Sequence, residues 1–171
     1  QVAALTAAQV AALTTAQVAA LETADLRAIT PTNIPSLTTA QIQALSLVQV
    51  AALTTAQVRA LETADLVALK PDQVEVLTAA QVGALTSEQV AALTTTQLQA
   101  LGSTALAAIS PEVIPALTTA QVQAISQAQM TWLTTAQLAA LELADLAVLS
   151  TTQLAGLTGS QVAAFTTAQI A

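Results

Sequence analysis

The sequence has no cysteine, histidine or tyrosine, one tryptophan and one phenylalanine. Thiolate nucleophiles and imidazole ligands for metals are therefore missing, and general acid–base catalysis has few groups to use. Ten acidic side chains stand against three basic ones (Arg27, Arg59 and Lys70), and the net charge is −7 at pH 7. Phosphate backbones would repel such a chain. We expect no nucleic-acid partner, no cofactor and no enzymatic activity.

Long apolar runs are also missing, although hydrophobic residues make up 54% of the sequence. Thr, Gln or Ser interrupts every stretch of about 18 residues, so no transmembrane helix is predicted and we expect no membrane insertion. The first residue, Gln1, is not preceded by a basic and apolar leader, and we expect any signal peptide to be removed or to lie elsewhere. The absence of cysteine is compatible with an exported bacterial protein that does not use disulfides.

What the sequence does contain is an uninterrupted eight-residue repeat. Twenty octads run from Leu5 to Ala164, and partial octads lie at both ends, over 1–4 and 165–171. Position one is always Leu, Ile or Phe, position six is always Val, Leu, Ile or Met, and position five is usually Gln. We interpret 1–171 as a single repeat array, and the partial octads are typical of a segment taken from a longer one.

Each octad is predicted to form one short helix. In a continuous helix, the apolar positions would advance by about 80° per octad and leave no constant face. In a β-strand, positions one and six would point to opposite sides. A helix of one and a half turns is too short to be stable alone, so neighbouring octads must stabilise it. The expected fold is an all-α solenoid, with positions one and six inside and alanines at positions four and eight allowing close approach.

The local chemistry of the octad indicates where each helix begins. In Leu13-Thr-Thr-Ala-Gln-Val18, the side chain of Thr14 is expected to cap the helix and that of Gln17 to reach back to the amide of Thr14, which is a capping box. Leu13 and Val18 occupy the two positions of a hydrophobic staple. Three prolines fall at position three, the first helical residue, where a missing N–H costs nothing: Pro31, Pro71 and Pro111.

A second period of 40 residues lies on top of the octads. The pattern Glu-x-x-Asp recurs at Glu22/Asp25, Glu62/Asp65 and Glu142/Asp145. We expect residues 40 apart to stack along the solenoid axis, which would place four glutamines in one column: Gln41, Gln81, Gln121 and Gln161.

An 80-residue echo is also present in the sequence. Residues 29–35 (ITPTNIP) resemble residues 109–115 (ISPEVIP). Pro35 and Pro115 come late in their octads, so these two helices should be short or become 3₁₀.

The acidic pairs Glu22/Asp25, Glu62/Asp65 and Glu142/Asp145 are the candidate metal ligands. If stacked, their carboxylates would supply several of the oxygen ligands that calcium prefers. The alternative, which we favour, is that they complement the dipoles at the N-termini of their helices. The equivalent octad at Leu101 carries Gly102 and Ala105, which breaks the column. The same pairs have no aromatic platform beside them of the kind that a glycosidase uses to hold sugar.

Threonine and the bulky residues give two further hypotheses. A regular array of Thr at positions two and three would match ordered water, as on an ice-binding surface, but the position-two Thr is already expected to act as a cap. Met130, Trp132 and Phe165 are the only bulky exceptions to Leu, Ile, Val and Ala. Trp132 would anchor a partner or, as we favour, fill a local gap or cover the end of the core.

Two resemblances carry further expectations. The string Leu-Thr-Thr-Ala-Gln-Val-Ala-Ala-Leu (residues 13–21) resembles the first helix of transcription activator-like effector repeats, but the second helix and the base-reading loop of those repeats have no counterpart here. The whole chain resembles the Leu/Thr/Ala/Gln-rich tandem arrays of large secreted or surface-attached, adhesin-like bacterial proteins. That resemblance implies an extracellular location and a role as stalk, matrix component or filament subunit.

The function that we expect is therefore a structural segment of an extracellular or cell-surface bacterial protein. Its partners would be neighbouring repeats of the same or identical chains, which would allow a homopolymer. The alternative is a repetitive module that binds calcium, a glycan or ice through stacked acidic or Thr positions.

Overall fold

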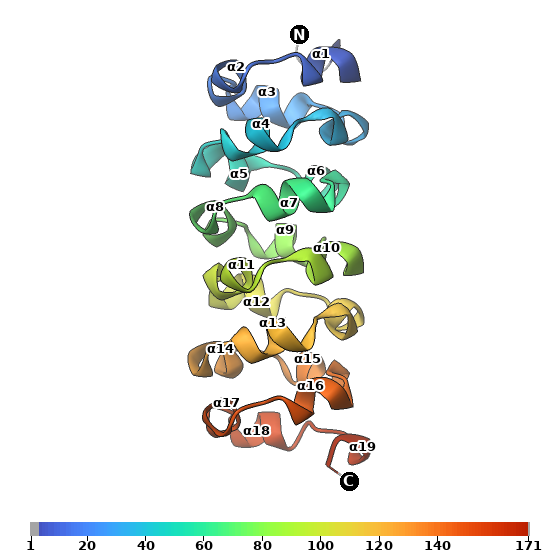
Figure 1. Cartoon of the computed structure of the whole chain (residues 1–171), viewed down its shortest axis with the longest axis vertical. Coiled ribbons are helices and arrows are strands. Elements are labelled where there is room, and N and C mark those ends of the chain that lie inside the picture. Colours follow the sequence, from blue (N-terminus) through green and yellow to red (C-terminus); the bar gives the residue numbers. More distant parts are fainter. Residues whose placement is uncertain (1–3, 171) are drawn as a thin grey trace.

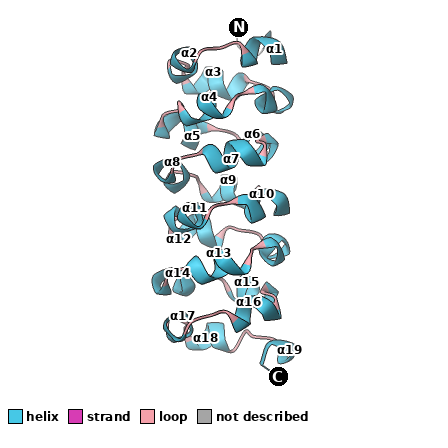
Figure 2. Ribbon diagram, viewed as in Figure 1, coloured by secondary structure: helices cyan, strands magenta, loops and turns pink. Residues whose placement is uncertain are grey.

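A computed structural model describes residues 4–170 as a tall coil of short helices, with no strand in this range (Figures 1 and 2). The chain winds from one end of the coil to the other, so the first and last described residues lie at opposite ends (Figure 1). We call the turn that precedes a given turn in the sequence the turn below, although Figure 1 draws the N-terminal end at the top. The prediction of an all-α solenoid is confirmed.

Every octad supplies one helix, and each helix begins at octad position three. The helices are α1 (Ala7–Ala11), α2 (Thr15–Ala19), α3 (Thr23–Ala28), η2 (Pro31–Ser36), α4 (Thr39–Gln43), α5 (Leu47–Ala52), α6 (Thr55–Ala60), α7 (Thr63–Ala68), α8 (Pro71–Glu75), α9 (Ala79–Gly83), α10 (Ser87–Ala92), α11 (Thr95–Ala100), α12 (Ser103–Ala107), η3 (Pro111–Ala116), α13 (Thr119–Ala124), α14 (Gln127–Trp132), α15 (Thr135–Ala140), α16 (Leu143–Ala147), α17 (Thr151–Ala155), α18 (Gly159–Val162) and α19 (Thr167–Ile170).

The predicted capping box fixes the start of these helices. At α9, the backbone N–H of Thr78 donates to Oε1 of Gln81 over 2.8 Å, and the N–H of Gln81 donates to Oγ1 of Thr78 over 3.3 Å. From α1 to α18, the same reciprocal pair forms wherever Thr or Ser at position two is followed by Gln at position five. Because two otherwise free donors are satisfied, the helix begins at the same place in each repeat.

The prolines behave as the sequence predicts. Pro31, Pro71 and Pro111 each stand in the first turn of their helix. Pro35 and Pro115 lie inside η2 and η3, which are 3₁₀ helices. A proline late in the octad has no N–H to donate, and in an α-helix its ring would clash with the carbonyl four residues earlier, so α-helical winding is disfavoured there.

The turns of the coil are set by contacts between helices three octads apart. Helix α4 packs against α7, α7 against α10, and η2 against both α1 and α6. Hydrogen bonds between turns reach 28 and 31 residues back along the chain, as from Gln81 to Leu53 and Val50. One turn therefore contains between three and four octads.

The expected stacking of residues 40 apart is wrong. Gln81 bonds to the turn that contains Leu53, and Gln121 bonds to Val90 and Leu93, so the four glutamines Gln41, Gln81, Gln121 and Gln161 do not form one column. Five octads are not a whole number of turns. Ten octads make about three turns, and η2 and η3, which begin 80 residues apart, accordingly lie on the same side of the coil (Figure 1).

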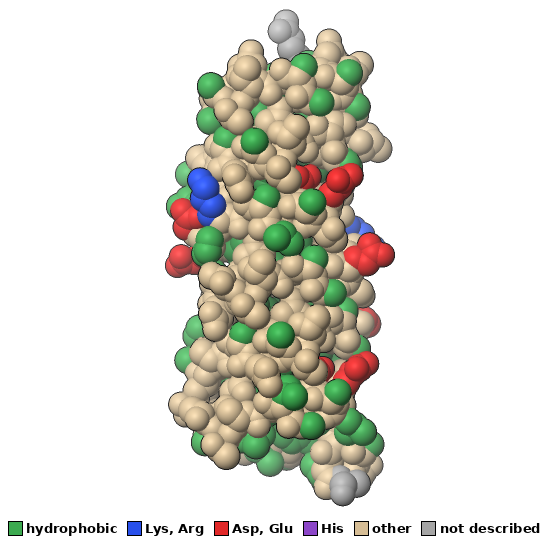
Figure 3. All heavy atoms as spheres, in the orientation of Figure 1, with side chains coloured by type: hydrophobic (Ala, Val, Ile, Leu, Met, Phe, Trp, Pro, Cys, Tyr) green, Lys and Arg blue, Asp and Glu red, His purple; other side chains and the backbone are tan. Residues whose placement is uncertain are grey.

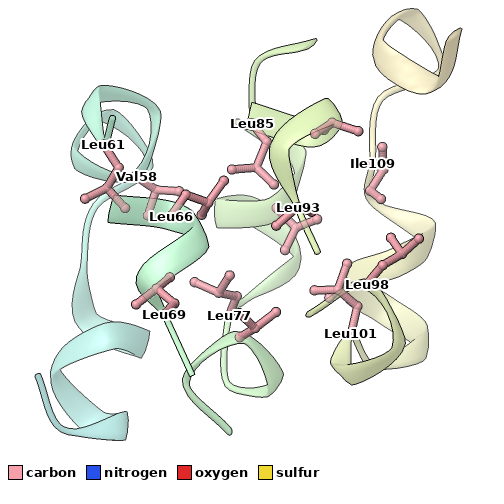
Figure 4. Close-up of a cluster of buried hydrophobic side chains, with 14 of the residues drawn as sticks. Val58, Leu61, Leu66, Leu69, Leu77, Leu85, Leu93, Leu98, Leu101 and Ile109 are labelled. Carbon is pink, nitrogen blue, oxygen red and sulfur yellow. The ribbon is translucent and has the colours of Figure 1, made fainter. Parts of the chain in front are cut away.

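The core is a continuous column made by positions one and six, as predicted. Val58 and Leu66 are fully buried at position six, and Leu61 and Leu69 are buried at position one. Figure 4 shows these side chains converging from successive turns into the space between the helices. Since each turn is too small to hold a core of its own, this shared column stabilises all of them.

The two alanine positions differ from the prediction. Position-four alanines such as Ala56 and Ala136 are exposed, and only the position-eight alanines, such as Ala60 and Ala100, are partly buried and pack against the core. The helix turns position four outward because positions five and six both face inward. Close approach between turns therefore occurs at position eight.

Gly156, at position eight, gives a direct test of this close approach. A Cβ atom at Gly156 would lie 2.8 Å from the carbonyl oxygen of Gln127 in the turn below. We expect Gly156→Ala to lower the free energy of unfolding by about 1–3 kcal/mol, because the turns must move apart. Urea unfolding followed by circular dichroism measures this change.

The matched control is Gly159→Ala, where a Cβ atom would meet nothing within 4 Å. This residue begins α18, and alanine there should leave stability unchanged or raise it by up to about 1 kcal/mol. Equal effects of the two substitutions would contradict close packing at position eight.

Candidate functional site

The most regular polar feature of the chain is a ladder of glutamines at octad position five, all buried except Gln169, which is partly buried. The side chain of Gln81 is 2% exposed, and its Nε2 donates to the carbonyl oxygens of Val50 (2.9 Å) and Leu53 (2.8 Å). The two carbonyls belong to the corner between the octads one turn below. We call this arrangement the glutamine ladder. Its members are Gln41, Gln49, Gln57, Gln73, Gln81, Gln89, Gln97, Gln121, Gln129, Gln137, Gln153, Gln161 and Gln169.

One side chain thus does two tasks in each repeat. The Oε1 of the glutamine accepts a hydrogen bond from the N–H of the N-cap residue of its own helix. The Nε2 donates to the carbonyls at the end of a helix and in the following corner, one turn below. Buried backbone carbonyls need such a donor because water cannot reach them. The capping half of this role was predicted from the sequence, but the link between turns was missed.

A signal for the link is present in the sequence. Glutamate at position five would complete the capping box as well as glutamine does, yet no octad has glutamate there. Glutamate lacks the N–H donors of glutamine. The exclusion of glutamate therefore indicates that position five must donate hydrogen bonds, as well as accept them.

Position five departs from glutamine in a few octads. Asn33 keeps part of the function, because its Nδ2 donates to the carbonyl oxygen of Leu5 over 2.8 Å. The remaining exceptions cannot donate through an amide: Asp25, Asp65, Ala105, Val113 and Asp145.

The acidic pairs lie apart from one another. Glu22, Glu62 and Glu142 occupy the N-caps of α3, α7 and α16, where their side chains make no capping bond. Glu62 and Glu142 are 80 residues apart, which places them on the same edge but in turns well separated along the coil. Figure 3 shows acidic side chains in separate groups along the coil, on both of its edges. Within residues 4–170, no three acidic side chains come close enough to hold a metal ion.

The aspartates of two pairs are buried. Asp65 and Asp145 are each 3% exposed. Burial raises the pKa of Asp65, and the neighbouring carboxylate of Glu62 raises it further. Burial also raises the pKa of Asp145, with a smaller opposing effect from the backbone N–H of Glu142 and a small further rise from the Glu142 carboxylate.

The threonines divide into two sets. The hydroxyls at position two, such as Thr54 and Thr94, accept from the backbone at the start of their helices. The position-three residues Thr55, Thr95 and Thr135 are exposed. Position-two threonines such as Thr94 are exposed as well, but their hydroxyls are already engaged at the start of a helix.

The three bulky residues also have different surroundings. Met130 is fully buried in the core, and Phe165 is partly buried against it. Trp132, at the end of α14, is 36% exposed and lies outside the core cluster. It is therefore not a member of the core column.

A groove with a volume of about 390 Å³ lies at the start of α7. Its lining consists of Arg59, Leu61, Glu62, Thr63, Ala64, Thr86, Glu88 and Gln89. These side chains include no nucleophile paired with a base. For the described range, no helix is long and apolar enough to span a bilayer.

Comparison with known families adds one finding. The family model described as the ALTTAQ repeat matches residues 1–23, 18–55, 58–95 and 138–171, which together cover more than half of the chain. Neither the curated proteins nor the solved structures contain a match to the chain.

The glutamine ladder leads to a second testable prediction. We expect Gln81→Ala to lower the free energy of unfolding by about 2–4 kcal/mol, because the buried carbonyls of Val50 and Leu53 lose their amide donor. Chemical unfolding followed by circular dichroism measures the loss.

Gln17→Ala is the matched control for this substitution. Gln17 makes the capping bonds to Thr14, but it is exposed and has no bond to another turn within the described residues. Its replacement should cost about 1 kcal/mol or less. If both substitutions have the same effect, the bonds between turns add nothing to stability.

Proposed function

Because the chain belongs to the ALTTAQ repeat family, we propose that it is a structural segment, serving as a stalk, spacer, matrix or filament component of an extracellular or cell-surface bacterial protein. The coarser part of this statement, a tandem helical repeat, follows directly from the match and the fold. The remainder is supported by the regularity of the coil and by the residues that the chain lacks.

The observation that carries the proposal is the uniformity of the glutamine ladder. The distance from the Nε2 of the glutamine to the carbonyl oxygen of the position-one residue in the turn below is 2.8 Å for Gln57, Gln97 and Gln153, which lie in different turns. Each turn therefore supports the next in the same way, and the length of the coil depends on the number of octads. A spacer needs this property, whereas a catalytic centre needs unlike residues gathered at one place.

The proposal includes the absence of enzymatic activity. The ionisable residues are few, and those in the groove at α7 combine exposed Arg59, Glu62 and Glu88 without a nucleophile. The acidic pairs lie in separate turns. This scattered arrangement of charges supports a structural role, in which the exposed charged side chains only interact with solvent.

The partners that we propose are neighbouring repeats, in the same chain or in identical chains. The outer surface is built from exposed small residues at positions three and four, such as Thr55, Ala56, Thr135 and Ala136. A low density of charge on this surface would permit lateral association and thus a homopolymer. The excess of acid speaks against nucleic acid as a partner.

The third prediction concerns length. Duplicating residues 29–108 adds ten octads and about three turns, so the register of the coil is preserved. We expect small-angle scattering to show a rod with the same cross-section and a longer axis. Thermal unfolding should occur at a higher temperature, because a larger fraction of turns has two neighbours.

The control for the duplication is the same insertion shortened by four residues, which shifts the octad register. This variant should show a break in the rod or a lower melting temperature. A duplicated chain that becomes globular, or that gains no length, would contradict the role as a spacer. Surface labelling of the intact producing cells with an antibody against the chain tests the proposed location.

A further inference from the structure

Asp145 occupies a ladder position without the chemistry of glutamine. Its side chain is 3% exposed, and its Oδ2 is buried with no hydrogen-bond partner. The backbone N–H of Glu142 opposes the rise in the pKa of this carboxyl group, and in other octads the corresponding N–H donates to the Oε1 of glutamine in the capping box. Oδ2 thus takes the place of the amide nitrogen that donates to the turn below in other octads.

The groups opposite this oxygen are themselves acceptors. A glutamine at this position would donate to the carbonyls 31 and 28 residues earlier, which belong to Ile114 and Leu117. The Ile114 carbonyl accepts the N–H of Leu117 over 3.0 Å, but no donor among the described residues reaches the carbonyl of Leu117. An ionised Asp145 would therefore place a buried negative oxygen against buried carbonyls, which is unfavourable.

A second buried aspartate occupies a ladder position 80 residues earlier. Asp65 is buried to the same extent, and the corresponding carbonyls belong to Ile34 and Leu37. These carbonyls lie at the C-terminal ends of the two 3₁₀ helices, η2 for Asp65 and η3 for Asp145. The coincidence of the two exceptions, repeated after about three turns, indicates a shared function.

We propose that Asp65 and Asp145 are acid-dependent links between turns, in which the protonated carboxyl group replaces the glutamine amide and donates its O–H to a corner carbonyl of the turn below. A carboxylic acid has one acceptor oxygen and one O–H donor, so it reproduces both halves of the role of glutamine. Loss of the proton removes the donor and loosens the link.

The direction of the pH effect follows from the raised pKa values of both aspartates. An acid with a higher pKa in the folded chain binds more protons when folded than when unfolded in the pH range between the two pKa values. Stability then falls as the pH rises through that range. The links are complete below the ordinary value of 3.8 and are lost above the folded pKa.

Few other charges face these links. Helix α16 packs on α13, which has no ionisable side chain, and the acidic neighbour of Asp145 is Glu142 at the start of its own helix. Helix α7 packs on α4, which is uncharged, and on α10, which carries Glu88. Glu62 lies beside Asp65, and Arg59 lines the same groove as Glu62. Most of these neighbours are acidic and favour the protonated form.

A proton suits this position better than a metal ion. Calcium takes six to eight oxygen ligands, whereas no three acidic side chains gather within the described part of the chain. This inference concerns the stability of two turns, and it is independent of the proposed role as a spacer.

The test compares the intact chain with the double variant Asp65→Asn, Asp145→Asn by thermal unfolding between pH 4 and pH 8. Asparagine supplies a donor at every pH. We expect similar melting temperatures near pH 4, and at pH 8 a melting temperature about 3 °C or more higher for the variant. The carboxyl carbon of Asp145, observed by NMR, should titrate above 3.8.

Glu75→Gln is the control, because it removes one exposed acid of α8 and should shift the melting temperature equally across this range. A constant difference between the intact chain and the double variant at all pH values would overturn the proposal. So would a rise in the melting temperature of the intact chain at pH 8 on addition of calcium that the double variant does not share, since a cation would then fill the gap.

Discussion

The fold depends on one problem of backbone chemistry, which is how to satisfy the carbonyl groups where each short helix ends and turns a corner. With one corner in every octad, the coil buries many carbonyls that have no helical partner. The amide of Gln81 and its equivalents supplies the missing donors from the turn above. Because the same amide group also starts a helix, each helix begins at the height where it can support the turn below. Helix start, corner and stacking are therefore fixed together.

Much of this architecture could be predicted from local rules. The capping boxes, the prolines at position three and the buried positions one and six follow from interactions within one octad or between adjacent ones. The register between turns could not be predicted in this way, because it depends on the angle through which the chain turns at each corner. A sequence period of 40 was taken for the structural period, whereas Gln81 bonds to Leu53, 28 residues earlier. Exposure of Ala56 and burial of Gln57 were missed for the same reason.

The candidate sites show the same limit. The sequence identified Asp65 and Asp145 as unusual, but it suggested a stacked column of carboxylates open to calcium. In the coil, the two aspartates instead take the place of glutamines in two different turns. The environment of each is set by residues 28 to 31 positions earlier, in the turn below. This error comes from the unknown rotation between octads.

That rotation affects how an array of this kind presents variation. Since ten octads make about three turns, five octads make about one and a half, and a residue repeated every 40 positions alternates between opposite sides of the rod. A residue repeated every 80 positions stays on one side, as η2 and η3 do. Duplication of a 40-residue block would thus place the residues that distinguish the block on two opposite sides of the rod. Duplication of an 80-residue block would place them all on one side. The sidedness of the rod is in this way determined by the size of the duplicated unit.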